Sequence, residues 1–504
     1  MKILLLAYEV ESNAILELSK MYKAEGHATN IMNCDYWTFT HNKNWYKNYK
    51  NYCDEFNNIE SEFCHLNSLE ADVDVDFKYL SDIEQKYSLS FNKIIKTDPI
   101  LYTISHERDD YVNSPTLIKY KWIEIIVRKV LQLLEDFKPD YILTINNNYF
   151  IKNLIFQISK AKEITFLTTL APRIGSKSII SSTFGFETDK YFKNQMENVG
   201  ESFLNESKQF IKNIIFSNKA SYDSHEIILK KIESNNFFIE FFQILKGSIR
   251  QFTLGLFHQK HYRGLFKSNY LDSHILKGLR GEIRNIFRRV RIYINNSFVT
   301  EINSDLKYYY IALHVIPESS ILTNSLDNLS EMNIIEEITS KMPIGTFLVI
   351  KENIEMLGIR SPKFYKNLSK LDNAILIDPN FNSMALIKNS LGVISMCGTN
   401  LVEACIANKR GIIVGTAEYS ALSFIEKYNK YDTKFPSFEL KPNSKNNILQ
   451  FIQTINILGV SIDQNFLLYA KYQQKNLNYL DYLAEVTKLK KLFDQNILLL
   501  ENHV

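Results

Sequence analysis

The apolar residues of this chain gather in short runs, and longer amphipathic segments separate the runs. In the N-terminal part, the runs predict strands at 2–8, 27–32, 141–145 and 164–169. Segments with helical periodicity lie between them, at 12–25, 118–136 and 150–161. Because strands that alternate with helices form a parallel sheet, we expect a Rossmann-like domain over 1–217. No GxGxxG sequence occurs in it, so a dinucleotide is not predicted.

The same alternation returns in the C-terminal part. Strands are predicted at 308–314, 347–351, 374–377, 392–395 and 411–414. The helices between them are predicted at 331–342, 361–370, 383–389 and 399–408. This pattern indicates a second Rossmann-like domain over 301–435, with functional turns at the carboxyl ends of its strands.

Two further regions complete the predicted organisation. Residues 218–300 are expected to form a helical, basic connecting region, and residues 436–504 are expected to be helical. The predicted fold class is therefore α/β, with two Rossmann-like domains, a helical insertion between them and a helical C-terminus. A length of 504 residues fits two or three domains.

Composition narrows the kinds of partner and compartment. The net charge of +3 is too small to indicate nucleic acid as a partner. The 5 cysteines show neither CxxC nor paired Cys/His spacing, so neither a disulfide framework nor structural zinc is expected. Apolar runs are too short to span a bilayer. We therefore expect a cytoplasmic protein.

The segment 276–291 concentrates positive charge beside an apolar stripe. Its basic residues are Lys277, Arg280, Arg284, Arg288, Arg289 and Arg291. Such a helix can lie on an anionic membrane surface, which would make the protein peripheral at the inner face of the cytoplasmic membrane. A helix docked on its own domain with a solvated basic face fits the same pattern. We favour docking, because the stripe is narrow and lacks tryptophan.

The segment 386–415 carries the sharpest local signal for a ligand. It reads as helix, strand, tight turn, helix and strand, with Gly398 and Thr399 in the turn. Glycine lets the backbone approach a phosphate closely, and the N–H groups of the next helix attract anions. Glu403 is placed to accept hydrogen bonds from sugar hydroxyls. Purely structural roles explain the same residues, with Thr399 as a helix cap and Glu403 as a complement to the helix dipole.

Other polar residues lie at the carboxyl ends of predicted strands. In the second domain, His314 and Lys351 end two strands and Asp378 follows a third, and in the first domain Arg173 follows a strand. The carboxyl ends of parallel strands meet at one edge, so the first three residues are expected to gather near Gly398. Lys351 and Arg173 are candidates to hold a phosphate, although Arg173 suits a surface salt bridge equally well.

Several stretches of the second domain resemble one family. They are HVIPESS at 314–320, MPIGTFLVIKEN at 342–353, LGIRSPKFY at 357–365 and SMCGTNLVEACIANKRGIIVG at 395–415. These stretches resemble the bacterial capsule and surface polysaccharide synthesis family, which includes Kdo-type transferases, and the domain layout resembles a GT-B glycosyltransferase. The resemblance implies a nucleotide-activated sugar on the C-terminal domain and a glycan or lipid-linked glycan acceptor on the N-terminal domain.

The resemblance also implies a set of donor-binding residues. The matches are His314, Pro317 and Glu318 to its H-x-x-P-E turn, Lys351 and Glu352 to its K-E pair, and Gly398, Thr399 and Glu403 to its G-T-x-x-x-E. The family usually continues its K-E pair with His-Pro, whereas this chain has Asn353 and Ile354. A His-Pro pair there looks like a contact to the nucleotide, so the resemblance does not identify the donor as CMP-Kdo.

An inverting transfer needs a general base beside the acceptor hydroxyl. Glu9, Glu11 and Asp140 are candidates by position. Lys351, Arg173 and the turn at Gly398 are expected to stabilise the leaving phosphate without a metal or other cofactor. The alternating acidic residues at 72, 74 and 76 suit the solvated face of an edge strand better than a metal site.

Two other functions fit the same layout. One is a nucleotide-sugar epimerase, which would act without a glycan acceptor. The other is a non-catalytic glycan-binding or assembly protein, which the missing His-Pro pair and the asparagine-rich turn at 146–148 suggest. Glycosyl transfer to a surface or capsular polysaccharide is the favoured interpretation.

Overall fold

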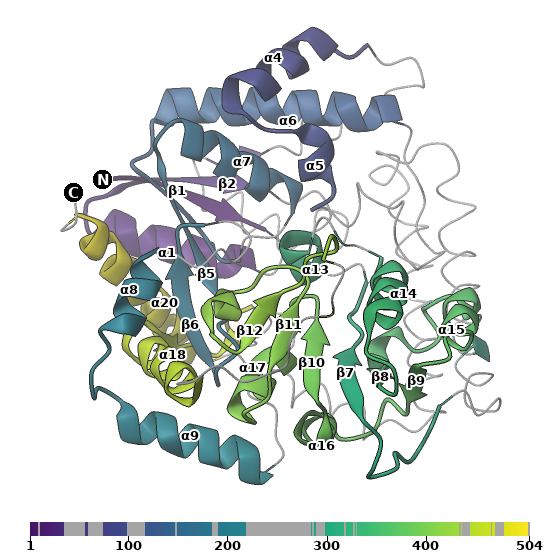
Figure 1. Cartoon of the computed structure of the whole chain (residues 1–504). Coiled ribbons are helices and arrows are strands. Elements are labelled where there is room, and N and C mark those ends of the chain that lie inside the picture. The colour runs from purple at the N-terminus through teal and green to yellow at the C-terminus, as the bar shows by residue number, and fades with distance from the viewer. Residues whose placement is uncertain are drawn as a thin grey trace.

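The computed structural model contains two α/β units, each built on one sheet (Figure 1). It describes residues 1–8, 11–34, 56–58, 74–97, 116–146, 149–183, 190–217, 284, 287–288, 298–316, 319–325, 328, 330–432, 435, 444–464, 466–468 and 478–501. The predicted helices of 218–300 and the basic segment 276–291 lie outside these residues, apart from a few isolated positions.

The first sheet has the strand order β13-β6-β5-β4-β1-β2-β3. Its strands are β1 (Lys2–Ala7), β2 (Ala28–Asn33), β3 (Phe56–Asn58), β4 (Tyr141–Thr144), β5 (Thr165–Leu170), β6 (Lys177–Ser181) and β13 (Val460–Ser461). Strands β1 to β5 pair in parallel, whereas β6 and β13 run antiparallel to their neighbours. This is the predicted parallel sheet with an antiparallel edge added.

Helices cover both faces of the first sheet. They are α1 (Ser12–Ala24), α4 (Phe77–Tyr87), α5 (Phe91–Ile95), α6 (Thr116–Phe137), α7 (Phe150–Ala161) and, from the end of the chain, α20 (Tyr479–Glu501). Leu4 and Leu6 of β1 lie in the core that includes α6 and α7, while Ile3 and Leu5 lie in the core that includes α1 and α20. Burial on both faces explains why β1 is an unbroken apolar run.

The second sheet has the strand order β12-β11-β10-β7-β8-β9, and all its strands are parallel. The strands are β7 (Tyr308–Ala312), β8 (Phe347–Lys351), β9 (Ala374–Ile377), β10 (Gly392–Ser395), β11 (Gly411–Ile413) and β12 (Ile425–Lys427). The helices are α13 (Ser319–Asn324), α14 (Glu331–Lys341), α15 (Pro362–Leu368), α16 (Ser383–Asn389) and α17 (Asn400–Ile406), with 3₁₀ turns η3 (Ile354–Met356) and η4 (Glu418–Ala421). The predicted fold class, α/β with Rossmann-like sheets, is confirmed.

Both sheets reverse their direction of growth beside their first strand. β1 lies between β2 and β4, and β7 lies between β8 and β10. The connections from the two neighbouring strands leave toward opposite faces, so a crevice opens at the carboxyl ends where the order reverses. The strand order therefore reverses at two positions, which we call the β1/β4 crevice and the β7/β10 crevice.

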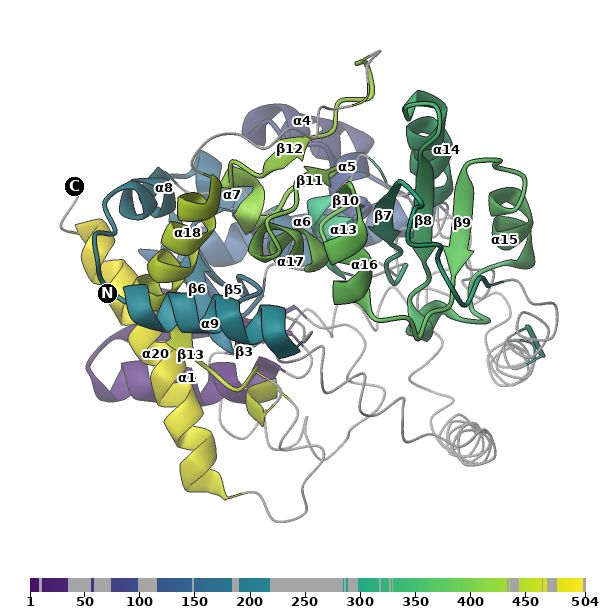
Figure 2. The ribbon, with the colours of Figure 1, turned by 60° about the horizontal axis from the view of Figure 1, so that its bottom comes forward.

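The end of the chain returns to the first domain, which the sequence did not predict. Helix α20 lies beside α1 (Figure 2), and Tyr22 donates a hydrogen bond to Asp494 at 2.9 Å. Helix α18 (Ser444–Leu458) packs on α8 (Lys190–Glu197) and α9 (Leu204–Ser217). Within the described residues, no helix is long and apolar enough to cross a membrane.

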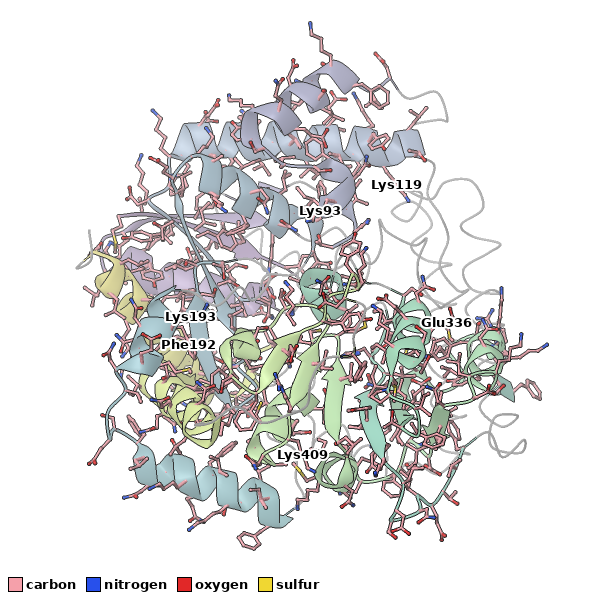
Figure 3. The ribbon with its side chains drawn as sticks, in the orientation of Figure 1. Lys93, Lys119, Phe192, Lys193, Glu336 and Lys409 are labelled. Carbon is pink, nitrogen blue, oxygen red and sulfur yellow. The ribbon has the colours of Figure 1, made fainter. Side chains whose placement is uncertain are left out.

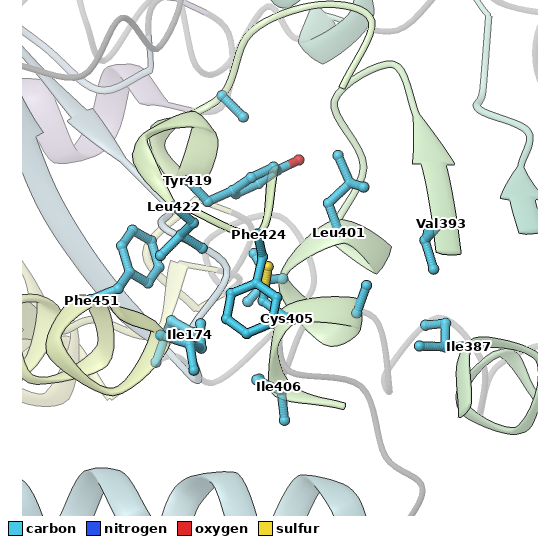
Figure 4. Close-up of a cluster of buried hydrophobic side chains, with 14 of the residues drawn as sticks. Ile174, Ile387, Val393, Leu401, Cys405, Ile406, Tyr419, Leu422, Phe424 and Phe451 are labelled. Carbon is cyan, nitrogen blue, oxygen red and sulfur yellow. The ribbon is translucent and has the colours of Figure 1, made fainter. Parts of the chain in front are cut away.

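One apolar cluster joins the two domains. Ile174 of the first domain, Tyr419, Leu422 and Phe424 of the second, and Phe451 of α18 belong to it (Figure 4). Their side chains are nearly inaccessible to solvent. The two sheets are therefore held together through a shared core.

One local interpretation of the sequence is wrong. Asp76, taken as part of an edge strand, accepts a hydrogen bond from the Tyr79 amide at 2.9 Å and caps helix α4. Its carboxylate also pairs with Arg128 at 3.0 Å. No cluster of potential metal ligands occurs among the residues that the structure describes.

We predict that Gly415→Ala destabilises the second domain. Gly415 donates its amide to the Met396 carbonyl at 2.9 Å, and Thr416 donates to the Asn324 carbonyl at 2.8 Å. An added Cβ would overlap the Asn324 carbonyl and lie 2.8 Å from that of Met396. Since both are backbone atoms, we expect a loss of about 1–3 kcal/mol in the free energy of unfolding, measured by urea denaturation. An unchanged unfolding midpoint would contradict this close contact.

Candidate functional site

The β7/β10 crevice brings together residues from two separate motifs of the sequence. His314 follows β7, and Ser395 ends β10. His314 Nε2 and Ser395 Oγ share a hydrogen bond of 3.3 Å, and the Gly398 amide donates to the same Oγ at 2.9 Å. His314 and the glycine turn therefore form one unit at the point where the strand order reverses.

The turn at Gly398 is tightly enclosed by polar atoms. An added Cβ would lie 2.7 Å from Asn400 Oδ1, 2.8 Å from Ser395 Oγ and 3.0 Å from His314 Nε2. The Gly398 carbonyl accepts a hydrogen bond from the buried Tyr419 hydroxyl at 2.7 Å. A side chain at this position would therefore displace the polar side chains around it.

Few amides of this turn remain for an anion. The Gly398 amide is committed to Ser395, and Leu401 and Val402 donate to the Gly398 and Thr399 carbonyls. The amides of Thr399 and Asn400 are those that the start of helix α17 does not use itself. Thr399 occupies the N-cap position, but its side chain makes no capping hydrogen bond.

A buried ionic network supports His314 from behind. Glu331, the first residue of α14, accepts from the His314 amide at 2.8 Å and lies 3.1 Å from its Nδ1. Arg360 pairs with Glu331 at 2.9 Å and donates to the His314 carbonyl at 2.8 Å. Burial acts to raise the pKa of Glu331, but Arg360 and His314 outweigh it and hold that pKa below its ordinary value. The sequence analysis identified neither Glu331 nor Arg360.

Lys351 and Glu352 are consecutive in the sequence, but their side chains point in different directions. Neighbouring residues of a strand point to opposite faces of the sheet. Glu352 is buried, and its carboxylate accepts from Arg360 Nε at 2.9 Å and from the Tyr365 hydroxyl at 2.7 Å. Burial raises the pKa of Glu352 in spite of these partners. Glu352 is therefore part of the support beneath His314 and lies away from Lys351.

Lys351 points toward the start of α16. Its Nζ donates to the Phe381 carbonyl at 2.6 Å and to Ser383 Oγ at 2.8 Å. Burial lowers the pKa of Lys351 to about 8, against the opposing charges of Glu403 and Asp378. This lysine and these two carboxylates, which follow three different strands, lie close enough to interact.

Asn353, which stands where the resembled family has histidine, has a local structural role. Its side chain accepts a hydrogen bond from the Glu355 amide at 3.0 Å and so caps the start of η3. Its own amide donates to Glu352 Oε1 at 2.7 Å. Ile354 is the first residue of η3.

The β1/β4 crevice of the first domain contains a buried ion pair. Glu11 accepts from Lys152 Nζ at 2.6 Å and from Asn146 Nδ2 at 3.1 Å. Asp140 precedes β4 and accepts from the Lys2 amide at 2.7 Å. It therefore lies at the amino ends of the strands, away from Glu11. Glu9 and Glu318 lie outside the residues that the structure describes.

Arg173 interacts with the second domain. It has a φ of +65° after β5, and its charge acts on Glu418 at the start of η4. Burial raises the pKa of Glu418 to about 7, against the opposing effect of Arg173. The sequence analysis did not identify Glu418.

Comparisons with known proteins add distant likenesses. No family model matches the sequence, and no curated protein matches it. A β-Kdo 2,7 transferase, KpsC of Thermosulfurimonas dismutans, is 12% identical, with 65% of this chain and 80% of that chain covered and a TM-score of 0.30. The UDP-GlcNAc 2-epimerase of Neisseria meningitidis, bound to UDP-GlcNAc, is 13% identical, with 90% and 92% covered and a TM-score of 0.23.

We predict that Glu418→Gln stabilises the protein at alkaline pH. With a folded-state pKa of about 7, raised above the ordinary 4.5, ionisation of Glu418 costs stability as pH rises between these values. The variant should gain up to about 3 kcal/mol in the free energy of unfolding at about pH 8 and far less at about pH 5. Urea denaturation at both pH values measures this. The exposed Glu336→Gln is the control, and an equal gain at both pH values for Glu418→Gln would contradict the assignment.

Proposed function

We propose that the chain is a glycosyltransferase that moves a sugar from a nucleotide-activated donor to a surface or capsular polysaccharide. The observation that carries this proposal is the meeting of His314 with the Gly398 turn in the β7/β10 crevice. Open α/β sheets bind ligands where the strand order reverses. Glu352 pairs with Arg360, which donates to the His314 carbonyl. The proposed contacts to the sugar donor are His314, Glu318, Lys351, Gly398, Thr399, Glu403 and Arg173.

Each proposed contact has a chemical role. Lys351 and the amides at Thr399 and Asn400 would stabilise the negative charge that develops on the leaving phosphate. Glu403, on helix α17, would accept hydrogen bonds from hydroxyl groups of the donor. The buried Asn400 Nδ2 has no hydrogen-bond partner among the described residues, and a buried donor group of this kind calls for one. An oxygen atom of a nucleotide sugar bound at this edge would be the missing hydrogen-bond acceptor.

The acceptor is proposed to bind the first domain. Among the described carboxylates considered as general base, Glu11 lies at the carboxyl ends of β1 and β4, where it accepts from Asn146. It would take the proton of the acceptor hydroxyl as the oxygen attacks the anomeric carbon and the nucleotide phosphate leaves. Glu11 also pairs with Lys152, whose Nζ lies 2.6 Å from its carboxylate.

A panel of nucleotides tests the proposal, with CMP, UDP, GDP and CDP measured by thermal shift. Binding of at least one nucleotide is expected to raise the unfolding temperature. Release of that nucleotide from its sugar only when a glycan acceptor is present would indicate transfer. Isomerisation of the nucleotide sugar without an acceptor would indicate an epimerase, and binding of none would leave a glycan-binding protein.

We predict that nucleotide affinity depends on the charge of Lys351. With a pKa of about 8, this side chain is charged below that pH and neutral above it. Affinity for the best nucleotide should therefore fall about tenfold between about pH 7 and about pH 9, as one charged contact is lost. Lys351→Arg should remove this fall, because a guanidinium stays charged. Titration calorimetry measures both proteins, and pH-independent affinity in the unaltered protein would argue against Lys351 as the phosphate contact.

A further inference from the structure

A continuous chain of polar contacts leads from Glu331 to the glycine turn. Glu331 is buried beneath His314 at the start of α14, and His314 bridges it to Ser395. Ser395 in turn accepts the Gly398 amide at 2.9 Å. Three elements, α14, β7 and β10, are thus connected by side chains at the β7/β10 crevice.

The chemistry of these groups orients the hydrogens along the chain. An ionised carboxylate can only accept hydrogen bonds, so the His314 Nδ1 atom beside Glu331 must carry a hydrogen. In a neutral ring the hydrogen is then absent from Nε2, which accepts from the Ser395 hydroxyl. While the Ser395 hydroxyl donates a hydrogen bond to His314, a lone pair of its oxygen accepts one from the Gly398 amide. Every hydrogen bond therefore runs in one direction, from the turn to Glu331.

A serine, a histidine and a carboxylate in this order also occur in nucleophilic catalysis. Ser395 is a poor nucleophile here, because its side chain is fully buried in β10. Its oxygen is moreover occupied by the Gly398 amide. The arrangement is better suited to holding the turn than to attacking a substrate.

We propose that Glu331 is a positioning residue that fixes the hydrogen of His314 on Nδ1 and thereby holds the turn at Gly398. Its relevance to a nucleotide sugar rests on the proposed function, since His314 and Gly398 are proposed donor contacts. The tautomer and the order of the turn are properties of the protein without any ligand.

The ionic network indicates which of its members is best replaced in a test. Arg360 lies between Glu331 and Glu352, with 2.9 Å to each carboxylate. Removing Glu331 leaves one guanidinium paired with one carboxylate. Removing Arg360 would instead leave two carboxylates buried together, a change expected to be far more damaging. Variants of Glu331 are therefore the suitable ones.

The test compares Glu331→Ala with Glu331→Gln. The alanine removes the acceptor for Nδ1, whereas the glutamine keeps one in its carbonyl oxygen. Long-range ¹H–¹⁵N spectra of histidine-labelled protein at alkaline pH report the tautomer, and His314→Gln assigns the signal. The control is Glu336→Ala, which removes an exposed carboxylate from the same helix (Figure 3).

We expect the Nδ1–H tautomer in the unaltered protein, in Glu331→Gln and in Glu336→Ala. In Glu331→Ala the hydrogen should move to Nε2, and amide exchange measured by mass spectrometry should rise at least about tenfold over 395–399 but not over α16. An Nε2–H tautomer in the unaltered protein, unchanged exchange in Glu331→Ala, or labelling of Ser395 by a fluorophosphonate would overturn the proposal. Failure of nucleotides to bind the unaltered protein would instead count against the proposed function alone.

Discussion

The reversal of strand order beside β7 is the constraint on which the candidate site depends. β7 and β10 are neighbours in the sheet, with Tyr310 paired to Val393, although the chain forms β8 and β9 between them. That pairing brings His314 beside the turn that contains Gly398. The first sheet repeats the arrangement at β1 and β4, where Glu11 meets Asn146. Both domains therefore present polar groups in the same topological position, and this symmetry motivates a donor on one domain and an acceptor on the other.

Buried charge determines what each crevice can do. Arg360, shared by Glu331 and Glu352, is fully buried, and buried ions persist only where their partners are close and well oriented. This network leaves Nε2 of His314 directed at the turn. Lys351 differs because its Nζ donates to a carbonyl and a hydroxyl, which carry no full negative charge. Burial lowers the pKa of Lys351 to about 8. A lysine of that kind gains most from an added anion, whereas Arg360 is already neutralised.

The sequence predicted the core elements well and the polar contacts in part. β8, β9, β10, α7 and α16 have the predicted bounds, because apolar runs with clear ends define them. The short strands β6, β12 and β13 were missed, since pairing with neighbours sets them rather than their own composition. His314 and Lys351 were selected by their place at strand ends and Glu403 by its place near a helix start, and their role in donor binding stays a prediction. Glu331 and Arg360 were missed because an acid at a helix start and a base in a loop resemble ordinary surface residues, and only tertiary contact shows that they are buried.

The central claim is that a sugar nucleotide binds in the β7/β10 crevice. A crystal structure of the chain soaked with the nucleotide that binds best tests it most directly. The account predicts phosphate density within hydrogen-bonding distance of Lys351 Nζ or of the Thr399 and Asn400 amides, with the nucleotide beside His314. Density for the nucleotide in the β1/β4 crevice, beside Glu11 and Lys152, would contradict the claim.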